Sequence, residues 1–425
     1  MILKRFIRNR DGSVAPMLAI AALPLLGFVG AAVDYSRAAS VRTAMQAAAD
    51  ASALMLSKNA PTLSDAELLQ QATDSFSAMF THPEARNVHV EAVFQQPENG
   101  SFTLRMTASA TVNTVFSQVL GRSEIPLSTS SEVLWGIKRL NLALVLDNTQ
   151  SMQKNAKMDN LKTAAHNLLA TLQNAAKKPD DIKVAIVPFN TDVNAGTENV
   201  GASWIDWTEW DAANGSCSNK NYTSKSSCER NNRTWTASAH STWNGCVYDR
   251  DQNNDVANTA TAPGSPATLF RAHQAANCPV SMMPLSTDWT ALNAKIDAMT
   301  PTGNTNVTIG LAWGFQLLSP VEPFNAPAPE SDLDKVIVIL TDGDNTQNRW
   351  SSSSKSIDAR TEKVCQNIKD ANIKVYTVRV IDGNASLLRG CATKPAMYYD
   401  VQQADQLNNV FSSIAQNLAN LRIAQ

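Results

Sequence analysis

Residues 140–151 of the chain read LNLALVLDNTQS, and residues 336–343 read VIVILTDG. Each stretch contains a continuous apolar run, Leu142 to Leu146 in the first and Val336 to Leu340 in the second, and a polar loop follows at once. A strand that helices cover on both faces of a parallel sheet needs such an unbroken run. The two stretches therefore predict buried strands, each ending in a loop at the edge of a sheet.

Helical and strand patterns alternate around these two runs. Apolar residues at helical spacing predict a helix after the first strand: Met158, Leu161, Ala165, Leu168, Leu169 and Leu172. The other predicted elements are strands at Ile182 to Phe189 and Ile373 to Val380, and helices at 356–371 and Ala404 to Leu421. This alternation is typical of an α/β fold, doubly wound, with a mostly parallel sheet. We expect this domain to occupy residues 139–421.

Oxygen-bearing side chains gather in the loops that follow the strands. Asp147, Thr149 and Ser151 stand at alternate positions after the first strand, Asp342 follows the second quoted strand, and Thr305 lies in a loop between them. Ligands of open α/β sheets bind at the carboxyl ends of the strands. Hydroxyl and carboxylate oxygens, without thiols or imidazoles, suit a hard divalent cation. We therefore predict a metal site for Mg²⁺, or for another hard divalent cation such as Mn²⁺ or Ca²⁺.

The three loops resemble the metal-ion-dependent adhesion site of von Willebrand factor A domains, written D-x-S-x-S, then a threonine, then an aspartate. The resemblance implies that the hydroxyls of Thr149 and Ser151 bind the ion, as that of Thr305 does in some states. It implies that Asp147 and Asp342 bind directly or through water. It also implies a von Willebrand factor A-like fold that captures an acidic side chain of a protein partner at the open coordination position.

One position departs from the usual D-x-S-G-S pattern of that family. Gln150 stands where the pattern has glycine, and a side chain there could crowd or reshape the loop. A domain that keeps the fold but binds no ion is therefore the alternative.

A polar insertion at residues 195–282 interrupts the predicted domain. It contains five tryptophans and four cysteines: Trp204, Trp207, Trp210, Trp235 and Trp243, with Cys217, Cys228, Cys246 and Cys278. Long excursions of this kind are usually functional or disordered. The tryptophans argue against simple disorder, and they form either a face that recognises a partner or a small core of the insertion's own.

The cysteines predict disulfides. Four cysteines in the insertion allow three pairings, of which we favour Cys217–Cys228 with Cys246–Cys278. Cys365 and Cys391 flank the last predicted core strand, and we pair them too. An even count at wide spacings fits an oxidising compartment, whereas buried free thiols in a cytosolic protein are the alternative. No C-x-x-C pair is present, which argues against a zinc framework.

Composition limits the other classes of function. A chain of 425 residues is expected to form two or three domains. Hydrophobic residues make up 44% of it, which is enough for a core. The formal net charge of -2 predicts no basic surface, so we expect no nucleic-acid partner.

An uncharged apolar run from Val14 to Val33 predicts a transmembrane helix, since about 20 residues cross a bilayer core. Basic residues precede the run, namely Lys4, Arg5, Arg8 and Arg10, and Asp34 closes it. The positive-inside rule then places residues 1–13 in the cytoplasm and the bulk of the chain in the periplasm. A cleaved signal peptide is the alternative, but the run is long for one. We predict a single-pass anchor in the inner (cytoplasmic) membrane.

The anchor continues into an alanine-rich segment, Tyr35 to Asn59, which predicts more helix up to Pro61. Residues 12–54 resemble the N-terminal segment of TadG-like proteins of the tight-adherence (Flp-type) pilus apparatus. The resemblance implies pilus-assembly or secretion subunits as partners. Prepilin processing would need glutamate five residues after the cleavage-site glycine. Counted from Gly12, that position is Met17, so we expect a permanent anchor.

Residues 34–138 predict a helical stalk and a small α+β module. Ser64 and Glu67 form a capping-box pattern that opens a helix reaching about Phe80. Alternating stretches after Asn87 predict three or four strands, with the turn Pro97–Gly100 linking the first two as a hairpin. Nothing in this module indicates catalysis, and we expect it to hold the C-terminal domain away from the membrane.

Two weaker motifs are set aside. Ser151 and Lys154 match the S-x-x-K motif of penicillin-binding proteins, but no K-T-G or S-D-N triplet accompanies them. Residues 249–253 imitate the opening of a calcium loop, but Asn254 and Ala260 stand where an EF-hand needs glycine and glutamate. We interpret residues 249–253 as a solvated loop.

Two function classes remain. The chain is either a binding component of a pilus-assembly system or an envelope hydrolase whose divalent ion activates water. We expect no histidine or lysine near the site to act as a general base, so we predict binding and no enzyme activity. A stand-alone envelope adhesin or sensor would differ from the first class mainly in its partners.

Overall fold

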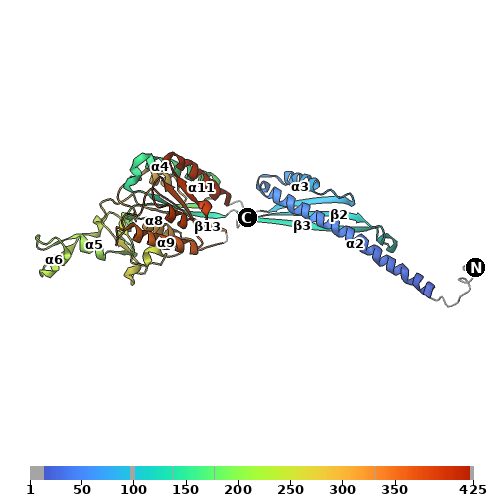
Figure 1. The fold of residues 1–425 in the computed structure, drawn as a ribbon, viewed down its shortest axis with the longest axis horizontal. Coiled ribbons are helices and arrows are strands. Elements are labelled where there is room, and N and C mark those ends of the chain that lie inside the picture. Colours follow the sequence, from blue (N-terminus) through green and yellow to red (C-terminus); the bar gives the residue numbers. More distant parts are fainter. Residues whose placement is uncertain (1–13, 96–100, 137, 177, 331, 422–425) are drawn as a thin grey trace, which may run out of the picture. The chain divides into compact units, whose positions relative to one another are not determined.

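The computed structural model describes residues 14–95, 101–136, 138–176, 178–330 and 332–421. The chain forms two compact units, and the second begins at Lys138. Each unit has its own sheet and its own core, and each is described by itself (Figure 1). The predicted cytoplasmic stretch 1–13 and the predicted turn Pro97–Gly100 lie outside the described residues.

A single long helix, α2 (Val14–Ser57), begins the first unit. The predicted span and the predicted alanine-rich helix are thus one continuous element, and Pro24 lies inside it. Large apolar side chains of its first half are exposed, including Phe28 at 77%. From Ala38 onward one face of α2 is buried. Among the described residues, α2 is the helix whose length and composition would allow it to cross a membrane.

The rest of the first unit packs against the second half of α2. A short 3₁₀ turn, η1 (Ala60–Thr62), leads to helix α3 (Asp65–Met79). The predicted capping box is present, since Ser64 accepts from the Glu67 backbone and the Glu67 carboxylate accepts from the Ser64 backbone. This reciprocal pair satisfies two donors at the helix start.

An antiparallel sheet completes the first unit, in the order β1–β2–β3. Its strands are β1 (Ala85–Gln95), β2 (Ser101–Asn113) and β3 (Glu124–Gly136), and the β2–β3 connector contains the 3₁₀ turn η2 (Ser117–Leu120). Alternate residues of β2, such as Leu104, Met106 and Ala108, are buried against α2 and α3. The alternation predicted from the sequence places one face of this sheet in the core.

A larger mixed sheet organises the second unit. Its order is β15–β14–β13–β4–β5–β6–β10–β11–β7, with β12 paired to β5. The five strands from β15 to β5 are parallel neighbours. Their bounds are β4 (Arg139–Asp147), β5 (Ile182–Phe189), β13 (Leu333–Thr341), β14 (Lys374–Val380) and β15 (Tyr398–Val401). The predicted doubly wound, mostly parallel α/β fold is confirmed.

Helices cover both faces of these parallel strands (Figure 1). One face carries α4 (Lys157–Ala175), α7 (Trp289–Asp297) and α11 (Leu407–Leu421). The other carries α8 (Val307–Leu318), α9 (Ser354–Asp370) and α10 (Ala385–Cys391). The 3₁₀ turns η3 (Gln150–Ala156), η8 (Pro395–Met397) and η9 (Ala404–Gln406) connect these elements. The last helix thus starts at Leu407, three residues later than predicted.

The strand β4 is apolar throughout its centre because helices cover both of its faces. Leu142, Leu144 and Leu146 pack into the core under α4 and α11, whereas Ala143 and Val145 pack into the core under α8. All five are fully buried. Gly310 and Gly314 let α8 approach β4 closely, because a Cβ at either position would meet the Val145 side chain.

The insertion extends the main sheet and does not form a separate domain. Two short strands flank it, β6 (Val193–Asn194) and β12 (Met283–Ser286). Within it, β7 (Ile205–Asp206), β10 (Cys246–Tyr248) and β11 (Phe270–Ala272) belong to the main sheet, whereas β8 (Gly215–Cys217) and β9 (Trp235–Ala237) pair only with each other. Its helical turns are η4 (Thr197–Gly201), α5 (Thr208–Ala213), α6 (Lys225–Arg230), η5 (His240–Thr242), η6 (Asn254–Val256) and η7 (Pro266–Thr268).

Four of the five tryptophans of the insertion join the main core. Trp210 and Trp243 are each 2% exposed and belong to the apolar cluster that includes Val145 and Phe315. Trp204 and Trp207 are partly buried against the same cluster. Neither sequence interpretation anticipated this, because both treated the insertion as separate from the sheet.

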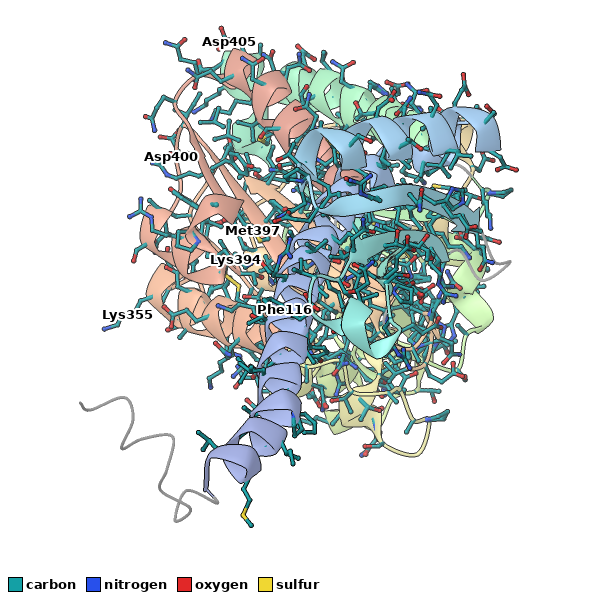
Figure 2. The ribbon with its side chains drawn as sticks, turned by 90° about the vertical axis from the view of Figure 1, so that its right-hand side faces the viewer. Phe116, Lys355, Lys394, Met397, Asp400 and Asp405 are labelled. Carbon is teal, nitrogen blue, oxygen red and sulfur yellow. A yellow bond between two sulfur atoms is a disulfide. The ribbon has the colours of Figure 1, made fainter. Side chains whose placement is uncertain are left out.

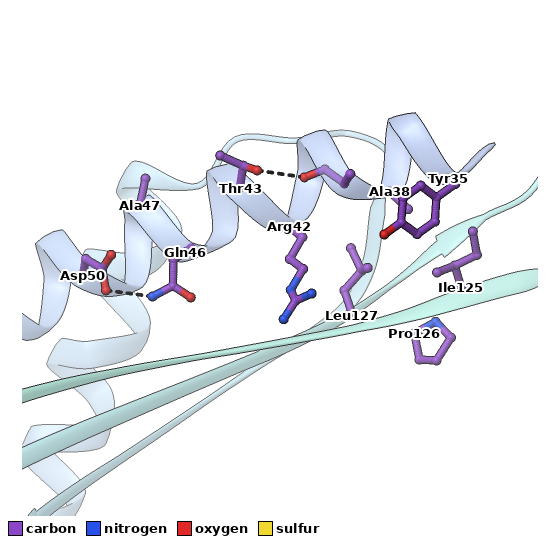
Figure 3. A pocket seen from close by; sticks show the side chains of 11 residues that line it. Tyr35, Ala38, Arg42, Thr43, Gln46, Ala47, Asp50, Ile125, Pro126 and Leu127 are labelled. Carbon is purple, nitrogen blue, oxygen red and sulfur yellow. Dashed lines mark hydrogen bonds between the residues drawn. The ribbon is translucent and has the colours of Figure 1, made fainter. Parts of the chain in front are cut away.

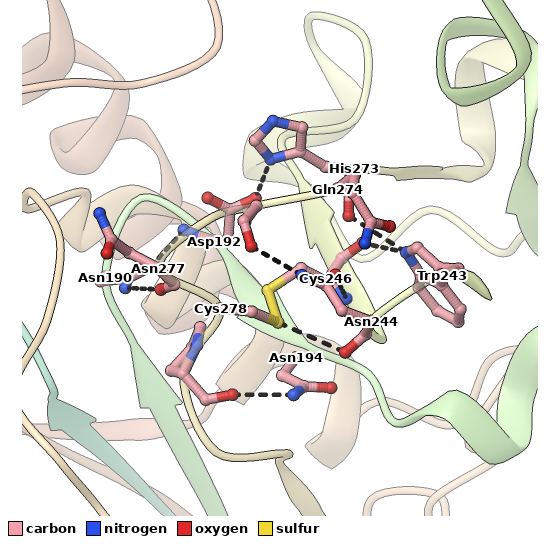
Figure 4. Close-up of a disulfide and its surroundings, with 12 residues drawn as sticks. Asn190, Asp192, Asn194, Trp243, Asn244, Cys246, His273, Gln274, Asn277 and Cys278 are labelled. Atoms are coloured by element: carbon pink, nitrogen blue, oxygen red, sulfur yellow. Dashed lines mark hydrogen bonds and ion pairs between the residues drawn. A yellow bond between two sulfur atoms is a disulfide. The ribbon is translucent and has the colours of Figure 1, made fainter. Parts of the chain in front are cut away.

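Three disulfides are present, and no described cysteine is free. They are Cys217–Cys228, Cys246–Cys278 and Cys365–Cys391, the pairs favoured from the sequence. Figure 4 shows the second of these beside β6 and β10, where the Trp243 indole donates to the Cys246 carbonyl at 2.7 Å. This disulfide therefore joins the strand β10 to the chain that returns toward β12.

Candidate functional site

Two loops of the predicted metal site, the one after β4 and the one after β13, meet because their strands are parallel neighbours. β4 and β13 pair in register from Leu333 with Arg139 to Leu340 with Leu146. Both strands end at the same edge of the sheet, so Asp147 and Asp342 leave it side by side. The Asp342 backbone N–H donates to the Asp147 carboxylate at 3.4 Å.

Asp147 is the most enclosed member of the site, with no exposed surface. Its carboxylate accepts from the Thr149 backbone N–H at 2.8 Å and from the Thr341 hydroxyl at 2.6 Å. Burial and the nearby Asp342 carboxylate raise the pKa of Asp147 to about 6. A cation near these two carboxylates would relieve both effects.

The hydroxyls predicted as ligands also lie together. Thr149 Oγ1 and Ser151 Oγ are 2.9 Å apart, and Ser151 Oγ donates to Asp342 Oδ1 at 2.5 Å. A Cβ added to Gly343 would lie 3.5 Å from Thr305 Oγ1 and 3.8 Å from Ser151 Oγ. The structure thus brings all five predicted site residues to one edge of the sheet.

Backbone hydrogen bonds hold the third loop of the site, residues 302–306, against the loop that follows β4. The Thr302 N–H donates to the Asn148 carbonyl at 2.7 Å, and the Gln150 N–H donates to the Gly303 carbonyl at 3.1 Å. Gly303 has a φ of 79°, a left-handed conformation that favours glycine. The Gln150 side chain is exposed, so it does not fill the space among the five oxygen-bearing side chains.

Lys157 is the residue that the sequence analysis missed. Its Nζ lies 2.7 Å from Asp342 Oδ2 and 3.5 Å from Asp382, and its side chain is 3% exposed. The expectation that no lysine lies near the site was therefore wrong. Asn155 and Ala156, both left-handed with φ of 55° and 52°, turn the chain so that α4 begins with Lys157 facing Asp342.

The oxygen atoms of the five site residues fit a hard divalent ion, but the Lys157 ammonium competes with such an ion for Asp342. Two carboxylates and three hydroxyls offer the oxygen chemistry that Mg²⁺ prefers. Among the described residues, no group of three or more His, Cys, Asp or Glu side chains could hold a metal ion, so a metal here depends on the hydroxyls. The ammonium of Lys157 already neutralises part of the Asp342 charge.

A second polar cluster joins the insertion to the third loop. Asp249 accepts from the Asn306 amide at 3.0 Å and from the Arg349 backbone N–H at 3.1 Å. Asn306 directly follows Thr305, so Asp249 helps to fix the third loop. Burial raises the pKa of Asp249 to about 6.

The interpretation of residues 249–253 as a solvated loop was wrong at its first two residues. Asp249 is 2% exposed and Arg250 3% exposed. Arg250 donates to the carbonyls of Thr259 and Thr268, while Asp251 accepts from Arg349 at 2.7 Å. The acidic residues that imitate a calcium loop are partners of arginines and of Asn306.

Family comparison agrees with this architecture. Residues 255–413 match the von Willebrand factor type A domain family. The second unit has a von Willebrand factor A-like fold, referred to below as the A domain. The match begins inside the insertion, so it includes Thr305 and Asp342 but not Asp147, which the fold places beside them. Residues 12–55 match a second family, described as putative Flp pilus-assembly TadE/G-like. The combination supports a pilus-associated protein, and neither description names an enzyme.

Among solved structures, the chain is similar to several proteins with low identity. The pilus adhesin SpaC from Lactobacillus rhamnosus GG in its open conformation is 13% identical with a TM-score of 0.40, and the match covers 80% of this chain and 35% of that one. The vWF domain of the type V pili tip protein Mfa5 from Porphyromonas gingivalis is 11% identical with a TM-score of 0.39, covering 68% and 97%.

Proximal thread matrix protein 1 from the mussel byssus, with a zinc-occupied MIDAS motif, is 14% identical with a TM-score of 0.34, covering 67% and 46%. The chain therefore spans only about a third of the SpaC chain and less than half of the mussel protein. No curated protein matches this sequence.

The first unit has an open groove of about 760 Å³ between α2 and β3 (Figure 3). Gln46 donates to Asp50 at 2.8 Å and to the Ser130 carbonyl at 3.2 Å, so these side chains are used within the unit. Tyr35 and Arg42 line the same groove. The groove brings together no set of residues comparable to the site of the A domain.

Proposed function

We propose that the chain is a membrane-anchored component of a tight-adherence (Flp-type) pilus assembly or secretion apparatus, and that its A domain binds a protein partner through a divalent ion. The observation that carries the proposal is the convergence of Asp147, Thr149, Ser151, Thr305 and Asp342 at one sheet edge. The TadE/G-like match of residues 12–55 supports the pilus context.

The residues of the site have distinct roles in this proposal. Ser151 and Thr149 would hold the ion through their hydroxyls, and Asp342 and Asp147 would balance its charge. An ion held by these residues would bind an acidic side chain of the partner as a further ligand. Thr341 and the Thr149 backbone keep Asp147 oriented, because both donate to its carboxylate. Asp249 and Asn306 keep the third loop, and with it Thr305, in place.

A hydrolase is the alternative that the site supports less well. Lys157 is near, but its ammonium donates to Asp342 and has no lone pair with which to accept a proton. Ser151 donates to the same carboxylate and has no histidine partner among its hydrogen bonds. We therefore propose that the protein is not an enzyme. A stand-alone adhesin or sensor would use the same site with other partners.

The proposed location is the inner membrane, with residues 14–33 as the span and the A domain in the periplasm. The exposed apolar first half of α2 supports the span. The three disulfides support an oxidising compartment.

Calorimetric titration of the purified full-length chain in detergent with Mg²⁺ or Mn²⁺ tests the metal site. Asp147→Ala should abolish ion binding, because it removes one of two carboxylates, while the circular dichroism spectrum stays unchanged. Asp344→Ala is the matched control, since Asp344 is an exposed carboxylate two residues beyond Asp342. Equal affinity in wild-type protein and Asp147→Ala would refute the site. Asp147→Asn, which retains hydrogen-bonding capacity, serves if the alanine variant misfolds.

A further inference from the structure

The β2–β3 connector of the first unit, residues 114–123, is tied to α2 at the residue that closes the apolar run. Asp34 is 2% exposed, and its carboxylate accepts three backbone N–H bonds from the connector. The donors are Val115 at 3.0 Å, Phe116 at 2.9 Å and Ser117 at 2.7 Å. Three charge-assisted bonds at one buried carboxylate fix the connector to this point of the helix.

The contact continues toward the N-terminus of α2. A Cβ added to Gly30 would lie 2.4 Å from Phe116 Cβ, so Phe116 lies directly against the helix at Gly30. Figure 2 shows Phe116 beside the α2 ribbon. Gly30 precedes Asp34 by four residues, about 6 Å along a helix. Phe116 therefore lies level with the last turn of the proposed membrane span.

The connector and this part of α2 expose apolar side chains together. Val115 is 56% exposed and Phe116 50% exposed, and on the helix Leu26 at 69% and Val29 at 60% are exposed within about one turn of Gly30. Beyond Asp34 the pattern reverses, because Ala38 and its successors face the core of the unit. The apolar surface of the connector is thus continuous with that of the proposed span.

Polar groups stand on the other side of this boundary. Arg37 follows Asp34 by three residues, about 4.5 Å farther from the span. In the connector, Gln118 and Arg122 are exposed, and the Arg122 carbonyl accepts from the Thr114 hydroxyl. Tyr35, which directly follows Asp34, is 72% exposed. A tyrosine ring at the edge of the hydrocarbon region, with basic side chains just outside it, is typical of a membrane interface.

We propose that the β2–β3 connector is a second membrane contact, in which Val115 and Phe116 enter the interfacial layer of the leaflet at the Asp34 end of α2. The partner is the lipid bilayer itself. The proposal rests on the proposed function, because it needs residues 14–33 to span the membrane. Anchored through both the helix and the connector, the first unit cannot swing freely about a single helix exit.

Fluorescence quenching in liposomes tests this contact. Because no described cysteine is free, a cysteine introduced at one site can be labelled selectively with an uncharged, environment-sensitive fluorophore. Full-length Phe116→Cys is reconstituted into phosphatidylcholine–phosphatidylglycerol vesicles whose lipids carry a nitroxide at the headgroup or at the acyl-chain end. Leu69→Cys, on α3 and 43% exposed, is the control in the same unit, and Leu25→Cys, 61% exposed and near the middle of residues 14–33, reports the span.

We expect the headgroup nitroxide to quench the label at 116 strongly and the acyl-end nitroxide to quench it less, with the reverse order at 25 and little loss at 69. Quenching at 25 but not at 116 would overturn the connector contact and leave the anchor standing. No quenching at 25 would overturn the anchor as well. Val115→Cys replaces Phe116→Cys if the latter fails to fold.

Discussion

Lys157 and Asp342 set the charge of the metal site. The ammonium lies 2.7 Å from one carboxylate oxygen, and both side chains are almost fully buried. A divalent ion that binds the same carboxylate must approach this ammonium, and two like charges at such distances repel by several kcal/mol even at an effective dielectric constant of about 20. Asp382, 3.5 Å away and 69% exposed, offers Lys157 an alternative partner.

This arrangement predicts that Lys157→Met strengthens metal binding. We expect the dissociation constant for Mg²⁺ to fall at least about tenfold, equivalent to about 1.4 kcal/mol. Without metal the same variant should lose about 3–5 kcal/mol of stability, because a buried carboxylate loses its partner. Calorimetry and thermal unfolding with and without Mg²⁺ measure the two effects.

Lys154→Met is the control, since Lys154 is an exposed lysine of the same loop and should leave both quantities unchanged. A Lys157→Met protein that binds Mg²⁺ no better than wild type would show that the two cations do not compete.

Side chains that follow strand ends could be predicted, and Lys157 could not. Asp147 and Asp342 were found because parallel strands bring their carboxyl ends to one edge, whatever the distance between them in the sequence. Lys157 reaches the site only because Asn155 and Ala156 adopt left-handed backbone conformations, which no local pattern signals. Residue 249 was misjudged for a related reason, since its partner Arg349 lies a hundred residues away.

Elements with a long repeating pattern were predicted well, and short ones were missed. β4, β5, β13 and β14 each carry a run of apolar residues, and their predicted bounds differ from the observed ones by a few residues. The strands β6, β7, β10 and β11 have two or three residues each, too few to show a period. Their place in the main sheet follows from tertiary contacts, so the insertion was mistaken for an independent excursion.

The Cys365–Cys391 disulfide joins α9 to α10 across the last central strand, and both sulfurs are buried in the core of that face. Removing it with Cys365→Ala and Cys391→Ala should lower stability by about 3 kcal/mol, because a cross-link over 26 residues restricts the unfolded chain. Denaturant unfolding of the wild-type protein and of this double variant, both under oxidising conditions, measures the difference in the free energy of unfolding. Cys217→Ala with Cys228→Ala, which opens a loop of 11 residues, should cost less. The reverse order would contradict the loop-length argument.

At the scale of the whole molecule, the orientation of the anchor in the membrane decides whether the disulfides can form. Lys4, Arg5, Arg8 and Arg10 precede the apolar run, and positive charge is retained on the cytoplasmic side. The cysteines all follow the span, so the proposed orientation places them where disulfides form and persist. A molecule inserted in the opposite sense would keep its cysteines in a reducing compartment. Cysteine oxidation therefore measures orientation.

Replacing the four N-terminal basic residues with glutamine should produce a mixed population. Wild-type chains in spheroplasts should be cleaved by external protease and show no thiol that alkylates after denaturation. The variant should contain a protected fraction, and in that fraction six cysteines should alkylate. Arg37→Gln with Arg42→Gln is the control, because removing charge beyond the span should leave the wild-type orientation intact. If wild-type protein were cleaved by external protease but had all six cysteines reduced, cysteine oxidation would not report orientation. If wild-type protein were protected from external protease, the proposed orientation would be reversed.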